Sequence, residues 1–254
     1  MTLEACSYPL SDDMEKNFCA LLSCIRHSMT GVLYAGLGAL QGAELGSKRH
    51  MLSIALTQDS PMMERVRASA RAFRVAVALG YLERADDQLF ISQIFIDENG
   101  KTLSNYRRAC GGFDGSTFRL EPRSPFEAFT YRGKTFAFAT GSDLLKYDRI
   151  AEIRALHPDV FLWSLITLDP DERSAEGSKR ALEDSIRRCG GHVVLVDAPA
   201  ANGSPSGFAA FYHDGKPVNA LGLSSAALCR GGTSARRQGS AFTGYSAYCD
   251  LEYA

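Results

Sequence analysis

Segments with the two-residue period of a β-strand alternate along this chain with segments of helical period, and this alternation limits it to an α/β fold. The first helix is expected to be capped by Ser11, because apolar residues follow it at helical spacing: Phe18, Leu21, Leu22, Ile25 and Met29. Proline is tolerated at the first helical position, so Ser60-Pro61 predicts a second helix start, with one apolar face formed by Met62, Val66, Ala70 and Phe73. Further helices are predicted at 147–156 and 173–189, and buried strands at 3–8, 31–40, 75–82, 160–165 and 192–197.

Three short turns predict β-hairpins. Asn99-Gly100 stands between the β-prone runs 90–97 and 101–107, which is a strong hairpin signal. Arg132-Gly133 and Asp214-Gly215 predict two more. Residues 224–240 are rich in Ser, Gly, Ala and Arg and are expected to form a mobile loop or an arm, followed by a closing strand at 245–253. With no linker or repeat, residues 1–254 are expected to form a single domain in which 223–254 supply a C-terminal arm and the closing strand.

Charge and composition exclude several classes of partner. The 28 basic and 29 acidic residues give a formal charge of −1, so the whole chain exerts no net attraction on nucleic acid or on an anionic membrane. The N-terminus has neither a basic start nor a long apolar core, and no later stretch is long enough to cross a bilayer. We therefore expect a cytoplasmic protein without a nucleic-acid or membrane partner.

The cysteines and histidines do not indicate a metal centre. The seven cysteines form an odd set without a Cys-x-x-Cys pair, which is typical of reduced thiols rather than of a disulfide framework or a zinc site. The five histidines are scattered without metal-ligand spacing. No metal and no cofactor are expected.

Four segments, in a shared order, resemble the carbon-nitrogen hydrolase (nitrilase and amidase) superfamily. Residues 92–108 are similar to a strand, turn and returning strand that end in Tyr-Arg-Lys in the family, and residues 133–143 resemble the strand that ends at the family's Cys-Tyr-Asp. Residues 208–218 are similar to a late hairpin, and residues 248–252 to the closing Ile-Asp-Leu strand. This resemblance implies a four-layer αββα sandwich that pairs as a homodimer through helices and the C-terminal tail.

The same resemblance implies that the family's Glu-Lys-Cys triad is replaced. The glutamate position falls on Gly36, the lysine position on Arg108 and the cysteine position on Gly141. A shifted alignment does not restore the triad, because no acid lies between Glu15 and Glu44, no lysine between 101 and 134, and no cysteine between 110 and 189. Glycine carries neither a nucleophile nor a proton acceptor, so hydrolysis through a thioester is excluded under this resemblance.

Polar residues around these positions are candidates for ligand binding: Arg107, Arg108, Cys110, Thr140, Ser142 and Asp143. Arginine binds carboxylate or phosphate in a bidentate manner, and ligands of α/β proteins gather at strand ends. Each candidate also has a structural alternative. Arg107 could point to solvent or pair with a surface acid, and Asp143 could cap the following helix. Cys110 is either a thiolate favoured by the neighbouring arginines or an inert buried thiol.

Two classes of function follow from these residues. The first is a pseudoenzyme that binds a small polar or anionic ligand, or a partner, without hydrolysing it. The second is an enzyme remodelled for non-thioester chemistry on a small amide, amino or carboxylate substrate. If neighbouring groups fill the site near Gly36 and Gly141, the pseudoenzyme is favoured. If the site is an enclosed cavity that holds a carboxylate with a strongly shifted pKa, the remodelled enzyme is favoured.

Overall fold

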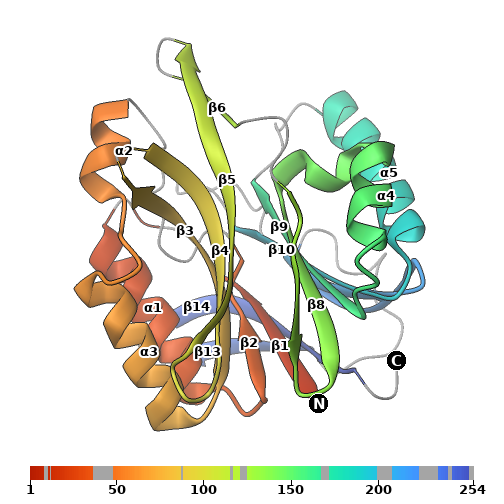
Figure 1. The fold of residues 1–254 in the computed structure, drawn as a ribbon. Helices are drawn as coiled ribbons and strands as arrows, with labels where there is room; N and C mark the ends of the chain where they lie inside the picture. The colour runs from red at the N-terminus through yellow and green to blue at the C-terminus, as the bar shows by residue number, and fades with distance from the viewer. Residues whose placement is uncertain are drawn as a thin grey trace.

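The computed structural model describes residues 1–8, 11, 13–36, 48–86, 88–114, 117–120, 125–166, 172–198, 208–222, 234–239 and 242–251. Two twisted sheets lie face to face, with helices on the outer side of each (Figure 1). This is the expected four-layer αββα arrangement, and the predicted fold class is confirmed.

The first sheet is mixed, with parallel β1, β2 and β3 at its centre. Its strands in spatial order are β13 (Ser234–Gly239), β14 (Phe242–Asp250), β1 (Thr2–Ser7), β2 (Val32–Tyr34), β3 (Ala76–Ala85), β4 (Gln88–Ile96), β5 (Thr102–Asp114) and β6 (Thr117–Leu120). The closing strand β14 pairs antiparallel with β1 and so joins the two ends of the chain in one sheet.

The second sheet has parallel β8, β9 and β10 at its centre and antiparallel strands at both edges. Its order is β12 (Lys216–Gly222), β11 (Phe208–His213), β10 (His192–Ala198), β9 (Val160–Ile166), β8 (Lys134–Thr140) and β7 (Ala128–Tyr131). The hairpin turns predicted at Asn99-Gly100, Arg132-Gly133 and Asp214-Gly215 are confirmed.

Helices cover the outer face of each sheet because their apolar faces match those of the strands. On the first sheet lie α1 (Met14–His27), α2 (Lys48–Ile54) and α3 (Pro61–Phe73), and on the second η2 (Gly141–Leu145), α4 (Tyr147–Arg154) and α5 (Glu172–Cys189) (Figure 1). None of the helices in the described ranges is long and apolar enough to cross a membrane.

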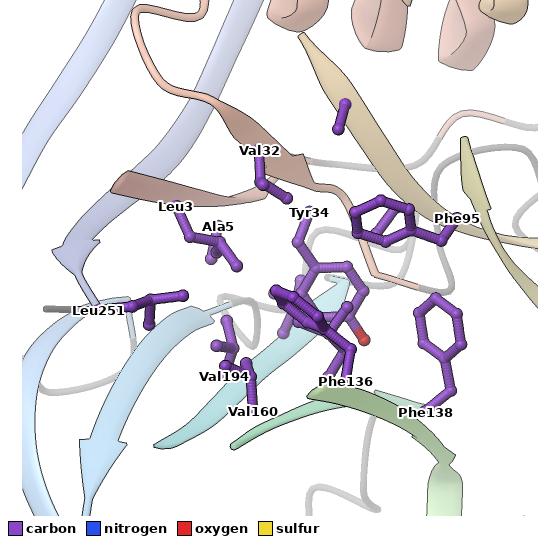
Figure 2. Close-up of a cluster of buried hydrophobic side chains, with 14 of the residues drawn as sticks. Leu3, Ala5, Val32, Tyr34, Phe95, Phe136, Phe138, Val160, Val194 and Leu251 are labelled. Carbon is purple, nitrogen blue, oxygen red and sulfur yellow. The ribbon is translucent and has the colours of Figure 1, made fainter. Parts of the chain in front are cut away.

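The central core lies between the two sheets (Figure 2). Alternation along β8 explains how one strand serves two layers: Phe136 and Phe138 point into this core, whereas Ala137 and Ala139 face the helices. Tyr34 reaches from β2 into the same core, with its hydroxyl group directed toward the second sheet (Figure 2). A polar group at such a place must find partners, and these lie beside the candidate site described below.

Several predicted details differ in the structure. Helix α1 is capped by Asp13 rather than Ser11, since Asp13 Oδ1 accepts from the backbone N–H groups of residues 15 and 16. Met29 follows the helix end and is 93% exposed, and Phe73 is also exposed, so neither contributes to the predicted apolar face. Residues 234–239 form an edge strand instead of part of a loop. Helix α2 has no predicted counterpart, and most of the loop predicted at 224–240 lies outside the described residues.

Candidate functional site

Two of the three positions implied by the resemblance meet where β5 of one sheet approaches the end of β8 in the other. Arg108 Nη1 donates to the backbone oxygen of Thr140, the last residue of β8, at 2.8 Å. Gly141 follows with a φ of +56°, a left-handed conformation that suits glycine, and begins η2. The Trp163 indole N–H donates to the backbone oxygen of Gly141 at 2.9 Å and holds this turn in place.

Asp143 fixes the geometry of the same turn. Its Oδ2 accepts from the backbone N–H of Thr140 at 2.9 Å and from the Tyr106 hydroxyl at 2.8 Å. Its Oδ1 lies 3.1 Å from Arg108 Nη1, and both side chains are almost fully buried. The structural alternative for Asp143 therefore applies, because the carboxylate caps the η2 turn, and the residue is also the acidic partner of Arg108.

Arg149 is a member of this site that the sequence did not indicate. Its side chain, only 2% exposed, places Nη2 3.9 Å from Asp143 Oδ1 and stacks its guanidinium 3.9 Å above the Phe126 ring. Glu152, which also pairs with Arg149, is 42% exposed. We call Arg108, Thr140, Gly141, Asp143 and Arg149 the strand-end cluster.

Gly36 lies at the same end of the two sheets, but its surroundings are filled. Its φ is +64°, and a Cβ atom built there would lie 2.6 Å from Cγ1 of Val196. Val196 pairs in register with Ser164, and Ser164 pairs with Thr140 of the strand-end cluster. Val196 therefore lies two strands away from Thr140, which is about 10 Å at normal strand spacing. Gly36 stands opposite Val196. A side chain at position 36 would have to displace Val196.

A buried polar network around Gln93 links β2 and β4 of the first sheet to β8 and β9 of the second sheet, next to the strand-end cluster. Gln93 accepts from the hydroxyl groups of Tyr34 and Ser164 at 2.8 and 3.0 Å, and donates to Ala139 O and Thr140 Oγ1 at 2.6 and 2.7 Å. The Tyr34 and Ser164 hydroxyl groups also hydrogen-bond to each other, and burial raises the pKa of Tyr34 well above its ordinary value. Thr140 thus accepts two hydrogen bonds: its side-chain hydroxyl accepts from Gln93, and its backbone carbonyl accepts from Arg108.

Arg107 does not join the strand-end cluster. Neighbouring residues of a strand point to opposite faces, and Arg107 lies on the helix side, where it binds Glu83 through Nε at 2.9 Å and Nη2 at 2.6 Å. Burial disfavours ionisation of Glu83, but hydrogen bonds from Arg107, Ser92, Asn105 and Gln58 outweigh it and lower the pKa of this carboxyl. Arg107 therefore pairs with an acid, as one of its structural alternatives predicts. That alternative is wrong in placing the acid at the surface, since Glu83 is a buried carboxylate.

Two candidates remain untested by the geometry. The side chains of Cys110 and Ser142 lie outside the described residues, although the backbone of Cys110 belongs to β5 and pairs with Leu120. Within the described part of the chain, no group of three or more His, Cys, Asp or Glu residues is arranged to hold a metal ion.

Comparison with known proteins gives three kinds of match. The family model described as carbon-nitrogen hydrolase matches residues 20–119. An arylacetonitrilase of Hypocrea virens is 28% identical over 138 residues, which cover 49% of this chain and 40% of that protein. A bromoxynil-specific nitrilase of Klebsiella pneumoniae subsp. ozaenae is 37% identical over 54 residues, 21% of this chain and 16% of the nitrilase. The matched region therefore spans less than half the length of these relatives.

Solved structures extend the likeness to the whole fold. An amidase from Nesterenkonia sp. superposes with a TM-score of 0.72 at 14% identity, covering 100% of this chain and 93% of the amidase. A mutant of that amidase with acrylamide added to its active-site cysteine gives a TM-score of 0.75 at 15% identity, covering 100% and 96%. At this identity the likeness establishes the fold alone. With the family model and the nitrilase relatives, it supports the membership of this chain in the nitrilase superfamily of carbon-nitrogen hydrolases.

Proposed function

We propose that this chain is a nitrilase-fold protein that does not hydrolyse amides or nitriles and instead binds a small polar or anionic ligand, or a partner, at the strand-end cluster. The observation that carries the proposal is the contact between Gly36 and Val196. At the position where the resemblance implies the general base, a Cβ atom would lie 2.6 Å from a valine methyl group, so this backbone leaves no room for a glutamate.

The other two positions support the same proposal. Gly141 offers no atom that can attack a carbonyl or nitrile carbon, and nucleophilic catalysis of the family's type requires one. Arg108 retains a positive charge, but a guanidinium does not release a proton at neutral pH and binds planar groups through a fork of donors. Ion pairing of Arg108 with Asp143 further suits an anchoring role rather than proton transfer.

Covalent labelling tests this proposal directly. In a mutant of the Nesterenkonia amidase, the active-site cysteine carries adducts of acrylamide and of the acetamide moiety of fluoroacetamide. With the same reagents, intact-mass analysis of this chain is expected to show only slow, unselective modification, chiefly at the exposed Cys19. A Cys19→Ser variant removes the modification at this residue.

Rapid stoichiometric labelling of the Cys19→Ser variant at Cys110, together with turnover of the amide, would overturn the proposal. That result would indicate thioester chemistry at Cys110, which neither of the two classes of function includes. A Cys110→Ala variant of the same background would then have to lose both the label and the turnover.

A further inference from the structure

We infer that His192 and His213, paired across β10 and β11, form a proton-sensitive contact that weakens the fold as the solution becomes mildly acidic. The two residues lie opposite each other in the antiparallel register, with ring centroids 4.5 Å apart and ring planes inclined at 40°. His192 is 8% exposed, and the side chain of His213 is 34% exposed. The pair lies at the end of the second sheet opposite the strand-end cluster, so the inference goes beyond the proposed function.

Both rings face the apolar core between the two sheets. Side chains alternate along a strand, and Val194 of β10 and Phe211 of β11, each two residues from its histidine, belong to that core. A proton on either ring therefore places a positive charge at the margin of the core and beside the other imidazole. Burial and a nearby cation both disfavour the charged form of histidine.

Hydrogen bonding makes the charged form costlier still. Within the described part of the chain, Nδ1 of His213 is buried and has no hydrogen-bond partner. Both ring nitrogens of an imidazolium carry a hydrogen, so protonation of His213 leaves a buried N–H group without an acceptor. The other ring nitrogen, Nε2, lies 3.4 Å from Oδ2 of Asp214, but this carboxylate is 69% exposed and its field is screened by water.

Two elements packed beside the pair carry further charges. On β12, Lys216 is the register partner of His213, so a protonated His213 lies across from a second cation. On the facing sheet, β1 contacts β10, and at the start of β1 the Met1 ammonium group pairs with Asp250 at 3.4 Å. Lys216 therefore acts in the same direction as burial, whereas the charges of Met1 and Asp250 largely offset each other.

The combined effect of these surroundings keeps His192 neutral. Burial, the neighbouring His213 and Lys134 of β8 lower the pKa of His192, and Asp159 and Asp214 oppose them only in part. Because the folded pKa lies below the ordinary value of 6.5, the unfolded chain takes up more protons than the folded chain below that pH. The neutral pair therefore stabilises the fold above pH 6.5, and this stabilisation is lost as the pH falls.

Urea unfolding at pH 7.5 and pH 5.5 tests the inference. For one proton taken up on unfolding, the unfolding equilibrium constant of the natural chain should rise by up to about tenfold per pH unit below 6.5. His192→Phe keeps an aromatic ring beside His213 but cannot bind a proton, so its rise should be several-fold smaller. His27→Gln, at an exposed position of α1, is the matched control and should behave as the natural chain does. An equal rise in the natural chain and in His192→Phe would overturn the inference.

A second variant and a direct titration keep the test decisive if His192→Phe folds poorly. His192→Gln also lacks a titrating group and is expected to show the same reduced rise. In the natural chain, the NMR signals of the His192 ring should titrate with a midpoint below 6.5. A midpoint at or above 6.5 would overturn the inference, and none of these outcomes bears on the turnover of amides or nitriles.

Discussion

At the scale of single residues, two glycines with left-handed backbone have opposite surroundings. A Cβ on Gly36 would lie 2.6 Å from Cγ1 of Val196, whereas a Cβ on Gly141 would lie 3.7 Å from Arg108 Nη1. A side chain at position 36 would have to displace Val196, whereas a Cβ at position 141 makes an ordinary van der Waals contact with Arg108 Nη1.

The closure at Gly36 predicts a stability change with an internal control. Gly36→Ala adds both a left-handed alanine and a clash with Val196, whereas Gly133→Ala adds only the left-handed alanine, because no atom lies within 4 Å of its Cβ. Urea unfolding should show a loss of about 1–2 kcal/mol for Gly133→Ala and about 1–3 kcal/mol more for Gly36→Ala. In the double variant Gly36→Ala/Val196→Ala, the part of the loss in unfolding free energy that comes from the clash should be regained. Equal losses for Gly36→Ala and Gly133→Ala would show that position 36 has room for a side chain.

At the scale of elements, the two sheets are joined by polar contacts as well as by their apolar core. Gln93 of β4 uses both ends of its amide to bind β2, β8 and β9. Glu98, in the turn between β4 and β5, accepts from the Tyr131 hydroxyl at 2.6 Å and from Arg132 at 2.8 Å on the hairpin of β7 and β8. These contacts set the position of β8, and hence of the strand-end cluster, relative to the first sheet.

Replacing Gln93 with leucine should destabilise the fold by about 2 kcal/mol or more, because the buried hydroxyl groups of Tyr34, Ser164 and Thr140 would lose a partner. Tyr34→Phe is the matched control, since it removes one hydroxyl group and keeps the ring in the core. Its expected loss is about 1 kcal/mol. Chemical denaturation measures both values, and a Gln93→Leu variant as stable as the natural chain would contradict this account of the network.

The Glu98 contact predicts a pH dependence. Burial opposes ionisation of Glu98, but hydrogen bonds from Tyr131 and Arg132 lower its pKa to about 2. Because the folded pKa lies below the ordinary value of 4.5, the contact stabilises the fold above that pH and the stabilisation is lost as the pH falls toward 2. The pair is near the surface, so its contribution is about 1 kcal/mol or less.

A Glu98→Gln variant isolates this contribution. The difference in unfolding free energy between the natural chain and Glu98→Gln should be largest at neutral pH and shrink steadily from pH 4.5 to pH 2. A difference that stays constant over that range would show that Glu98 is not held ionised by the hairpin.

At the scale of the whole molecule, the sequence predicts structural features that depend on residues close together in the chain. The predicted hairpin at Gly100, with its φ of +77°, and the predicted helix start at Ser60-Pro61 depend on neighbouring residues, and both are confirmed. Contacts between distant segments were not predictable, such as Val196 against Gly36 or Arg108 beside Asp143. Strand alternation alone would have separated Arg107 from Arg108, because adjacent residues face opposite sides of a sheet.

The homodimer implied by the resemblance stays a prediction. Light scattering combined with size-exclusion chromatography is expected to give twice the 27.6 kDa mass of the chain. A concentration-independent monomer would contradict it, and would leave the strand-end cluster unaffected, because all five of its residues come from one chain.

Ammonia release measures whether this nitrilase fold cleaves carbon-nitrogen bonds, and we propose that it does not. The purified chain is incubated with a panel of aliphatic and aromatic amides, nitriles and N-carbamoyl compounds, beside a heat-denatured control. We expect ammonia release no faster than in the control for every compound. Sustained release from the native chain that is lost in Cys110→Ala or Arg108→Gln would contradict it.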